Sequence, residues 1–592
     1  MAIDALTTSG INSLVNSFIQ SESLKRVTPL KERQTRFNKL SSAYSSLLSQ
    51  INALKNSLSA LKDTSKNNVF NSKTVKSSNE SRINASVSSN AIAGSYNLRV
   101  NQLAKNDTVL SLDTISNSYT SITSPGNYSF RIKSGDGLGN NFNALVTLKL
   151  QASDFDSTGI KFSSLANKIS QAFNNDSAEI ESSLVSGTNS SSGNFKFVIG
   201  GIEHTINYSA GGYEDVIDEI VNQLDDITGV TAEKVTTGGS FGIKINASDS
   251  SKYIQMKDDS GSLLSSLGIS NDKFISASRI ASISVFSPES GRTQISLSTK
   301  NTGYDFRFTE LSDISTGGLL NEFGINFGTV RTSFVQNTGG TDTPGYLYST
   351  SQLNSKLTLN GVQIDRNSNK VNDLIEGVNL NLLSLSEAGE ADITLTISNN
   401  SSEIKSKIEN FITNFNNIYK YLRDNLSSAK DKRGLLIGDS NAGSLVNLLS
   451  SYAVNPLLGF SSSVINSLSK LGITFNVNSG ISISDESQLL NSIQNKLTEV
   501  EDFFNNSSNG FAKKLFDAVD AYTGAEGFLT KAQLQLNSTI NFLNDNIKNS
   551  EMRIQKSADR LRAQYQRLQS QLATLLSNQS YFMGNIFNQQ GF

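Results

Sequence analysis

The sequence predicts a multidomain α+β protein in which both termini form a helical coiled-coil stalk, with β-rich α+β head domains inserted between them. Three observations predict this fold class. The chain has 592 residues, about four times the length of an average domain. Apolar residues recur at alternating spacings of three and four near both ends. From about Asn67 to Ser401, alternating strand patterns and turn residues replace the helical period.

The N-terminal helix carries a continuous heptad seam. Its apolar positions are Phe37, Leu40, Tyr44, Leu47, Ile51, Leu54, Leu58 and Leu61. At 1.5 Å per residue, these positions span about 36 Å of helix. Pro29 interrupts the helical pattern before this seam. The segment upstream of Pro29 is therefore predicted to be a separate short amphipathic helix.

The C-terminal end repeats the pattern. Its seam positions are Ile547, Ile554, Leu561, Tyr565, Leu568, Leu572 and Leu575. The outer positions carry Arg553, Lys556, Arg560, Arg562 and Arg567. Because each seam needs an apolar partner, the simplest arrangement pairs the two seams lengthwise, with the middle of the chain carried as a long insertion.

The middle of the chain contains a repeat with a period of about seventy residues, judged by pattern rather than by identity. In each copy, alternating strands adjoin a helix with one apolar face, at 162–173 and at 213–224. With the stalk, this predicts four parts. They are a terminal coiled-coil leg (1–42 with 551–592), a helical stalk domain (43–72 with 400–550), a β-rich head domain (73–125 with 281–399) and an outer head domain with repeated βαββ units (126–280).

Little in the sequence supports catalysis. There is no cysteine, and His204 is the one histidine, in an alternating strand that implies no catalytic partner. The glycines of 135–139 precede a strand instead of joining a strand to a helix, so a hairpin turn is favoured over a phosphate loop. The carboxylate pairs 225–226 and 258–259 lack the ligand spacing of a calcium loop. The sequence therefore predicts no catalytic residues, no metal site and no cofactor.

Composition excludes further classes. The formal net charge is -2, whereas nucleic-acid binding needs a basic excess, so we expect no nucleic-acid partner. No apolar run approaches the roughly 18 residues of a membrane span, so we expect no membrane insertion. Basic and apolar signal regions are not visible at the N-terminus, since the first lysine is Lys25. We therefore expect no cleaved secretory signal.

Both ends also carry apolar residues beyond the paired seam. These docking candidates are Ile11, Leu14, Phe18, Tyr581, Phe582, Ile586 and Phe587. Because they keep a helical period, a docking surface is favoured over fraying tails.

Several short motifs, taken in order along the chain, resemble the bacterial flagellar filament cap family, the FliD type, also called hook-associated protein 2. They are Ser9–Val15, Pro29–Leu30, Ser42–Tyr44, Ala93–Tyr96, Val100–Ala104, Leu359–Val362, Asn367–Asn369, Leu374–Val378, Gly438–Ser440, Leu471–Ile473 and Tyr581–Phe587. The resemblance covers both ends well, whereas the middle matches only in pattern.

The resemblance implies a structural protein at the distal end of the filament. It implies a homo-oligomeric ring, five subunits by family likeness, that promotes flagellin insertion and prevents loss of exported subunits. Flagellin, hook-filament junction proteins and an export chaperone are the implied partners. Export through the flagellar channel without a cleaved signal peptide is also implied, and a cysteine-free chain suits passage in an unfolded state.

Other functions stay open at this point. The chain could be another axial flagellar protein, either a junction protein or flagellin. Exposed head domains could act as a surface adhesin for host glycans or mucin. A glycosidase would have only its Asp and Glu pairs as catalysts.

Overall fold

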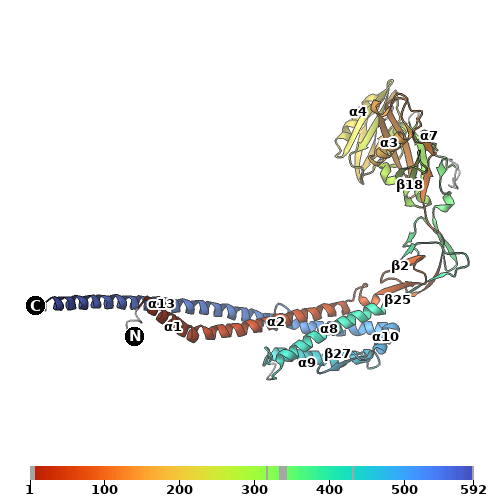
Figure 1. The fold of residues 1–592 in the computed structure, drawn as a ribbon. Coiled ribbons are helices and arrows are strands. Elements are labelled where there is room, and N and C mark those ends of the chain that lie inside the picture. Colours follow the sequence, from red (N-terminus) through yellow and green to blue (C-terminus); the bar gives the residue numbers. More distant parts are fainter. Residues whose placement is uncertain (1–6, 315–317, 333–342, 430–432, 590–592) are drawn as a thin grey trace. The chain divides into compact units, whose positions relative to one another are not determined.

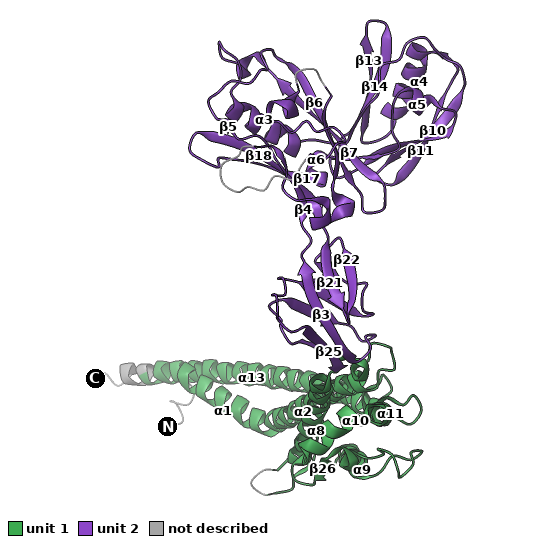
Figure 2. Cartoon of the chain, turned by 90° about the vertical axis from the view of Figure 1, so that its right-hand side faces the viewer, with its two compact units in different colours: residues 1–74, 399–592 green, residues 75–398 purple. Residues whose placement is uncertain are grey.

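The computed structural model describes residues 7–314, 318–332, 343–429 and 433–589, with side chains up to residue 583. The chain forms two compact units, Met1–Thr74 with Asn399–Phe592, and Val75–Ser398 (Figure 2). The first unit is mainly helical and the second mainly β (Figure 1). The predicted fold class, with helices from both termini and a β-rich middle, is confirmed. The finer division into four parts stays a prediction.

The helical unit is built from both ends of the chain. Its helices are α1 (Thr8–Arg26), α2 (Thr28–Leu61), α8 (Ser401–Leu426), α9 (Ser440–Val454), α10 (Glu486–Asn495), α11 (Leu497–Asn505), α12 (Phe511–Thr523) and α13 (Phe528–Gln589). The 3-10 turns η2 (Val69–Asn71) and η6 (Leu468–Leu471) and the hairpin β26 (Ile473–Asn476) and β27 (Gly480–Ile483) complete the set. Pro29 lies in the first turn of α2, where its missing N–H costs no helical hydrogen bond.

The core of the helical unit gathers around α2. Leu47, Ile51 and Leu54 are fully buried, and α2 packs against α8, α12 and the first part of α13. This differs from the lengthwise pairing of the two seams predicted from sequence. The predicted face of α2 is buried, but from Leu47 to Leu61 α8 and α12 cover it together with the start of α13, not the residues from Ile547 to Leu575. A heptad pattern identifies which face is buried and does not identify the neighbour that covers it.

The β-rich unit and its border contain the remaining elements. The strands are β1 (Lys73–Ser77), β2 (Ile83–Val87), β3 (Gly94–Gln102), β4 (Asn106–Leu110), β5 (Thr114–Ile115), β6 (Gly126–Gly135), β7 (Asn141–Leu150), β8 (Glu179–Glu181), β9 (Thr188–Asn189), β10 (Gly193–Ile199), β11 (Ile202–Tyr208), β12 (Gly211–Gly212), β13 (Val230–Thr237), β14 (Ser240–Ala247), β15 (Ile254–Ser260), β16 (Lys273–Phe274), β17 (Ala281–Phe286), β18 (Arg292–Thr302), β19 (Phe308–Asp313), β20 (Gly345–Tyr346), β21 (Ser355–Leu359), β22 (Val362–Arg366), β23 (Lys370–Val371), β24 (Val378–Leu382) and β25 (Ile393–Asn399). The helical pieces are α3 (Phe162–Asn174), α4 (Tyr213–Asp225), α5 (Leu263–Ser266), α6 (Ala277–Ile280) and α7 (Leu319–Glu322), with 3-10 turns η3 (Ala152–Asp154), η4 (Tyr304–Phe306) and η5 (Thr350–Gln352).

A seven-stranded sheet organises the larger part of this unit, in the order β11-β10-β15-β16-β7-β6-β19. The two-residue strand β16 joins its two sides, antiparallel to β15 and parallel to β7. A separate hydrophobic core lies on each side, one including α3 and the other including α4. Both helices lie where the apolar period predicts them, and each buries one face.

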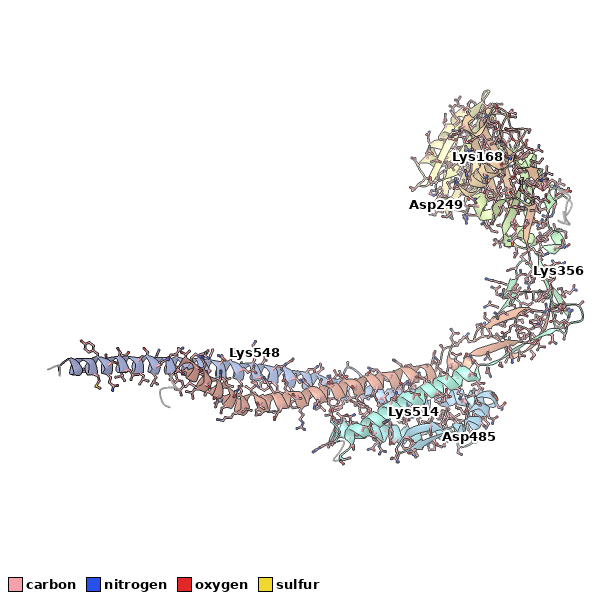
Figure 3. The ribbon with its side chains drawn as sticks, viewed as in Figure 1. Lys168, Asp249, Lys356, Asp485, Lys514 and Lys548 are labelled. Atoms are coloured by element: carbon pink, nitrogen blue, oxygen red, sulfur yellow. The ribbon has the colours of Figure 1, made fainter. Side chains whose placement is uncertain are left out.

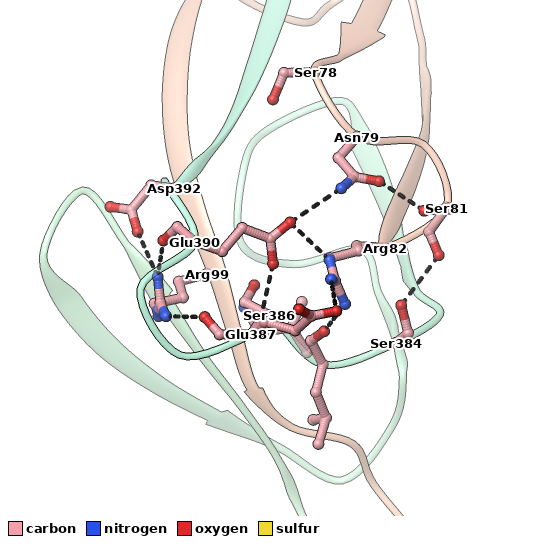
Figure 4. A network of polar contacts seen from close by, with 12 residues as sticks. Ser78, Asn79, Ser81, Arg82, Arg99, Ser384, Ser386, Glu387, Glu390 and Asp392 are labelled. Carbon is pink, nitrogen blue, oxygen red and sulfur yellow. Dashed lines mark hydrogen bonds and ion pairs between the residues drawn. The ribbon is translucent and has the colours of Figure 1, made fainter.

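Arginine side chains hold loops of the β-rich unit in place. Arg82 donates to Glu387 at 2.7 Å and to Glu390 at 2.9 Å, and Arg99 donates to the carbonyl oxygens of both these residues at 2.6 Å (Figure 4). Because guanidinium donors are fixed in a planar fork, the two arginines together fix the loop between β24 and β25.

Candidate docking site on the helical leg

The candidate site is the leg, which we define as α1 with the part of α13 beside and beyond it. Both α1 and the neighbouring helix α2 run antiparallel to α13. Lys31 Nζ lies 2.7 Å from Glu551 Oε1, and Ser41 Oγ donates to Asn537 Oδ1 at 3.4 Å. Further toward the C-terminus of α13, α2 gives way to α1, whose Val15 packs near Ala558. Each part of α13 up to this point therefore has a helix beside it.

The contact between α1 and α13 is small. Ile11, Val15 and Ala558 form its buried centre, with exposures of 2%, 0% and 0%. A second small cluster holds Val27 with Ile547 and Ile554. The methyl side chain of Ala558 leaves room for the two larger side chains of α1.

This contact corrects part of the docking set predicted from sequence. Ile11 is buried against α13 and is not a free apolar residue, and Phe18 is partly buried at the edge of the same cluster. Leu14 remains exposed on the outer side of α1. Ile11, Leu14 and Phe18 share one apolar face by their helical spacing, and the sequence does not show which edge of that face meets α13.

The apolar stripe of α13 continues beyond the part that α1 covers. Ile554 is buried, whereas Leu568, Leu575 and Phe582 are 51%, 64% and 68% exposed. These four positions lie at multiples of seven residues from one another, so they share one face of the helix. Figure 1 shows α13 running on past the end of α1. Figure 3 shows that the side chains of this last part of α13 stand clear of the other helices of the unit.

The other predicted seam and docking residues fall into four groups. Leu40 and Phe37 are partly buried against the α2 core, as are Leu561 and Tyr565 against α1. Tyr44, Leu58, Leu61 and Ile547 are buried, whereas Leu572 is partly exposed and Tyr581 is exposed. Ile586 and Phe587 lie outside the residues whose side chains the structure describes.

We use the word tip for residues 568–583 of α13. The sequence has no charged residue from Leu568 to Phe592, and the tip carries Leu, Tyr, Phe and Met among Gln, Ser, Asn and Thr. Exposed apolar side chains on an uncharged helix favour contact with another helix of the same kind. The tip can therefore act as an unfilled half of a helical interface.

One polar contact ties the α2 seam to the helical core. Tyr44 donates a hydrogen bond to Asp439, which also accepts from the backbone N–H groups of Asn441 at 2.9 Å and Ala442 at 3.0 Å as the N-cap of α9. Burial, followed by this hydrogen bond, raises the pKa of Tyr44 above its ordinary value. The loop carrying Asp439 is thus fixed both to α2 and to α9.

The structure assembles no catalytic group from the residues weighed in the sequence. His204 is partly exposed on the edge strand β11, and Asp258 and Asp259 are exposed. Asp136 accepts from the N–H groups of Leu138 at 2.8 Å and Asn140 at 3.0 Å, as a turn residue does. No cluster of metal-ligating residues occurs among the residues that the structure describes.

Sequence reasoning places Val15 on the apolar side of the first helix but not among the docking candidates, and it misses Val27. Both are buried as deeply as most of the predicted seam residues. Their signal was the helical spacing with Ile11 and Ile19 upstream of Pro29. Within the described residues, none of the helices combines the length and apolar character that crossing a bilayer requires.

Comparison with known proteins gives consistent results. A family model described as the flagellar hook-associated protein 2 N-terminus matches residues 9–107, and one described as the C-terminus of the same protein matches residues 353–576. The chain is similar to the B-type flagellar hook-associated protein 2 of Pseudomonas aeruginosa, 26% identical over 53% of this chain and 72% of that protein. It is also similar to the polar flagellar hook-associated protein 2 of Vibrio parahaemolyticus, 28% identical over 32% of this chain and 28% of that protein.

Among solved structures, the flagellar cap protein FliD D1-D2-D3 domains from Escherichia coli match 83% of this chain and 99% of that chain. The sequence identity is 17% and the TM-score is 0.46.

Proposed function

Because the chain belongs to the flagellar hook-associated protein 2 family of filament cap proteins, we propose that its leg docks the protein among the subunits at the distal end of the filament. We further propose that several copies form a closed ring there, which promotes flagellin insertion and retains exported subunits. The ring needs a contact that repeats head to tail and closes, and the legs need an exchangeable hold on the filament.

The observation that carries the docking proposal is the uncovered part of the α13 stripe. The face that buries Ile554 beneath α1 presents Leu568, Leu575 and Phe582 to solvent about four, six and eight helical turns further on. Burying a large apolar side chain contributes about 1.5–3 kcal/mol. A partner helix laid along the stripe would therefore gain several such contributions.

The modest gain from burying only a few apolar side chains favours reversible docking. Ordering a flexible helical end costs conformational entropy, which offsets part of the gain from apolar burial. Each leg then binds modestly, and several legs in one ring hold the assembly together by avidity. One leg can release and rebind while the others stay attached, as insertion of new subunits beneath a cap requires.

The uncovered tip also suits the partners expected before assembly. An apolar stripe of this kind exposed in the cell would need covering, which fits an export chaperone. Flagellin and the junction proteins are the proposed helical partners at the filament, because a tip without charges matches helices that bury apolar faces.

The test replaces the stripe with serine. The triple variant Leu568→Ser, Leu575→Ser and Phe582→Ser is expected to keep its folded helical unit, since all three side chains are exposed. It should lose sedimentation with purified filaments and fail to restore motility to a strain that lacks the protein. Circular dichroism before the assay checks the fold.

The matched control uses the same helix. Leu534, Phe542 and Met552 are 62%, 64% and 47% exposed on α13 and lie off the stripe, so their triple serine variant should bind filaments as the wild type does. Filament binding by the stripe variant at wild-type strength would refute the docking proposal.

A further inference from the structure

Three arginines form a second stripe on α13, distinct from the apolar one. Arg553, Arg560 and Arg567 are spaced by seven residues and are all exposed. Successive members lie about 10.5 Å apart along one face of the helix. This arginine stripe ends where the uncharged tip begins.

The arginine stripe has no compensating carboxylate within the leg. Between residues 548 and 567 the sequence has six Lys or Arg residues and two acidic ones. Both acids are already engaged, Glu551 with Lys31 at 2.7 Å and Asp559 with Arg562 at 3.5 Å. In the described part of the chain, none of the three stripe arginines makes a hydrogen bond or an ion pair.

The facing helix does not supply a carboxylate either. From Thr8 to Ser21 the sequence of α1 has no charged residue. Glu22, its first acid, pairs with Arg26 at 2.7 Å and with Lys25 at 3.7 Å. In a chain whose net charge is -2, a row of three uncompensated cations on one helix face is a local excess.

A groove lies at the base of the arginine stripe. It has a volume of about 300 Å³ and is lined by Phe18, Glu22, Arg26, Ser550, Arg553, Ile554 and Ser557. Its walls combine apolar surface from Phe18 and Ile554 with charged side chains. Arg26 is already paired with Glu22 at 2.7 Å, so Arg553 is the cation of the groove that has no ion-pair partner among the described contacts. Such a groove accepts an apolar side chain that has a carboxylate beside it.

We propose that the arginine stripe and its groove bind an acidic α-helix of a partner protein, one that carries carboxylates at seven-residue spacing next to an apolar seam. This inference names the chemistry of the docking partner and takes its setting from the proposed function. The apolar tip then provides affinity, whereas the arginine stripe sets the register and selects among helices by charge. The part of the partner helix that lies beside the uncharged tip is expected to carry no charge.

The test uses the full-length protein and two synthetic helical peptides with the same leucine seam. One peptide carries glutamate at three positions seven residues apart, and the other carries glutamine there. Wild type should prefer the glutamate peptide by about tenfold at low salt, as expected for three exposed ion pairs, and the preference should fall below about twofold at 0.5 M salt. The triple variant Arg553→Gln, Arg560→Gln and Arg567→Gln should show no preference.

The matched control removes three other exposed cations of the helical unit, two on α2 and one on α13, with Arg33→Gln, Arg36→Gln and Lys548→Gln. It changes the net charge equally and should keep the wild-type preference. Equal binding of both peptides by wild type overturns the inference. An unchanged preference in the triple arginine variant overturns it too. Arginine-dependent binding to phosphatidylglycerol vesicles without peptide discrimination overturns it in favour of a lipid surface.

Filament sedimentation separates this inference from the proposed function. Suppose that the triple serine variant of Leu568, Leu575 and Phe582 binds filaments as wild type does, and that wild type still prefers the glutamate peptide. The filament proposal then fails and the acidic-helix inference stands. If filaments bind in a tip-dependent way and the peptides are not distinguished, the reverse holds.

Discussion

Replacement of Arg331 by methionine should destabilise the β-rich unit by about 3–5 kcal/mol, because it leaves a buried carboxylate without its counter-ion. Asp107 is fully buried, and both its oxygens accept from Arg331 at 2.7 Å. Arg331 also donates to the carbonyl of Tyr348 at 2.9 Å and lies 3.9 Å from the centre of the Tyr346 ring. Without it, the one remaining donor in the described contacts of the Asp107 carboxylate is the N–H of Phe308, at 3.0 Å.

Hydrogen exchange read on β4, β18 and β20 measures this effect within the β-rich unit, which avoids treating a chain of two units as one two-state system. Arg366→Met is the matched control, because Arg366 pairs with Asp373 at 2.9 Å at an exposed site, where such a pair contributes about 0–1 kcal/mol. The double variant Asp107→Asn with Arg331→Met should recover part of the loss, since no uncompensated charge remains. A change below about 1 kcal/mol in Arg331→Met would refute the reasoning.

Three shorter predictions concern other sites. Burial raises the pKa of Asp176 to about 7, above the value near 3.9 of an unfolded chain, so the stability it contributes is present at low pH and lost as pH rises through about 7. Asp176→Asn should therefore be more stable than wild type at pH 8 and show a flatter thermal stability profile between pH 5 and 8; an unchanged profile contradicts this. Asp439→Ala should cost about 1–2 kcal/mol in urea unfolding of the helical unit, through loss of the α9 cap, and Asp439→Asn much less. Gly472→Ala should lower the melting temperature, because φ is 73° and a Cβ would overlap the carbonyl oxygen of Asp485; an unchanged melting temperature contradicts this.

The helical seams show what local patterns can predict. The spacing from Leu47 to Leu61 identifies a helix and its buried face correctly, because the 3.6-residue period determines which side chains share a face. The neighbours that cover this face, α8 and α12, come from residues more than three hundred positions later in the chain. Nothing in the periodicity of α2 distinguishes them from the C-terminal half of α13.

The site was less predictable than the fold. Ile11 and Leu14 look alike in the sequence, yet Ile11 is buried against Ala558 and Leu14 is exposed. Which of them faces α13 depends on how α1 is rotated and aligned against α13. These two helices lie at opposite ends of the sequence, so no local pattern determines their alignment. The pair of Asp107 with Arg331 was likewise not predictable, because no short-range pattern links residues 224 positions apart.

The division of stability within the helical unit follows from the same contacts. α2 belongs to a large core shared with α8, α9, α11 and α12. In contrast, α1 meets α13 through one cluster of three buried residues, and Val27, directly after α1, meets α13 through a second. Elements with few buried contacts open at lower free energy than the core around them. α1 can therefore separate from α13 while the body of the unit stays folded, which extends the apolar stripe available to a partner from the tip down to Ile554. The docking of exchangeable legs that we propose would use this combination of a stable body and a weakly held α1.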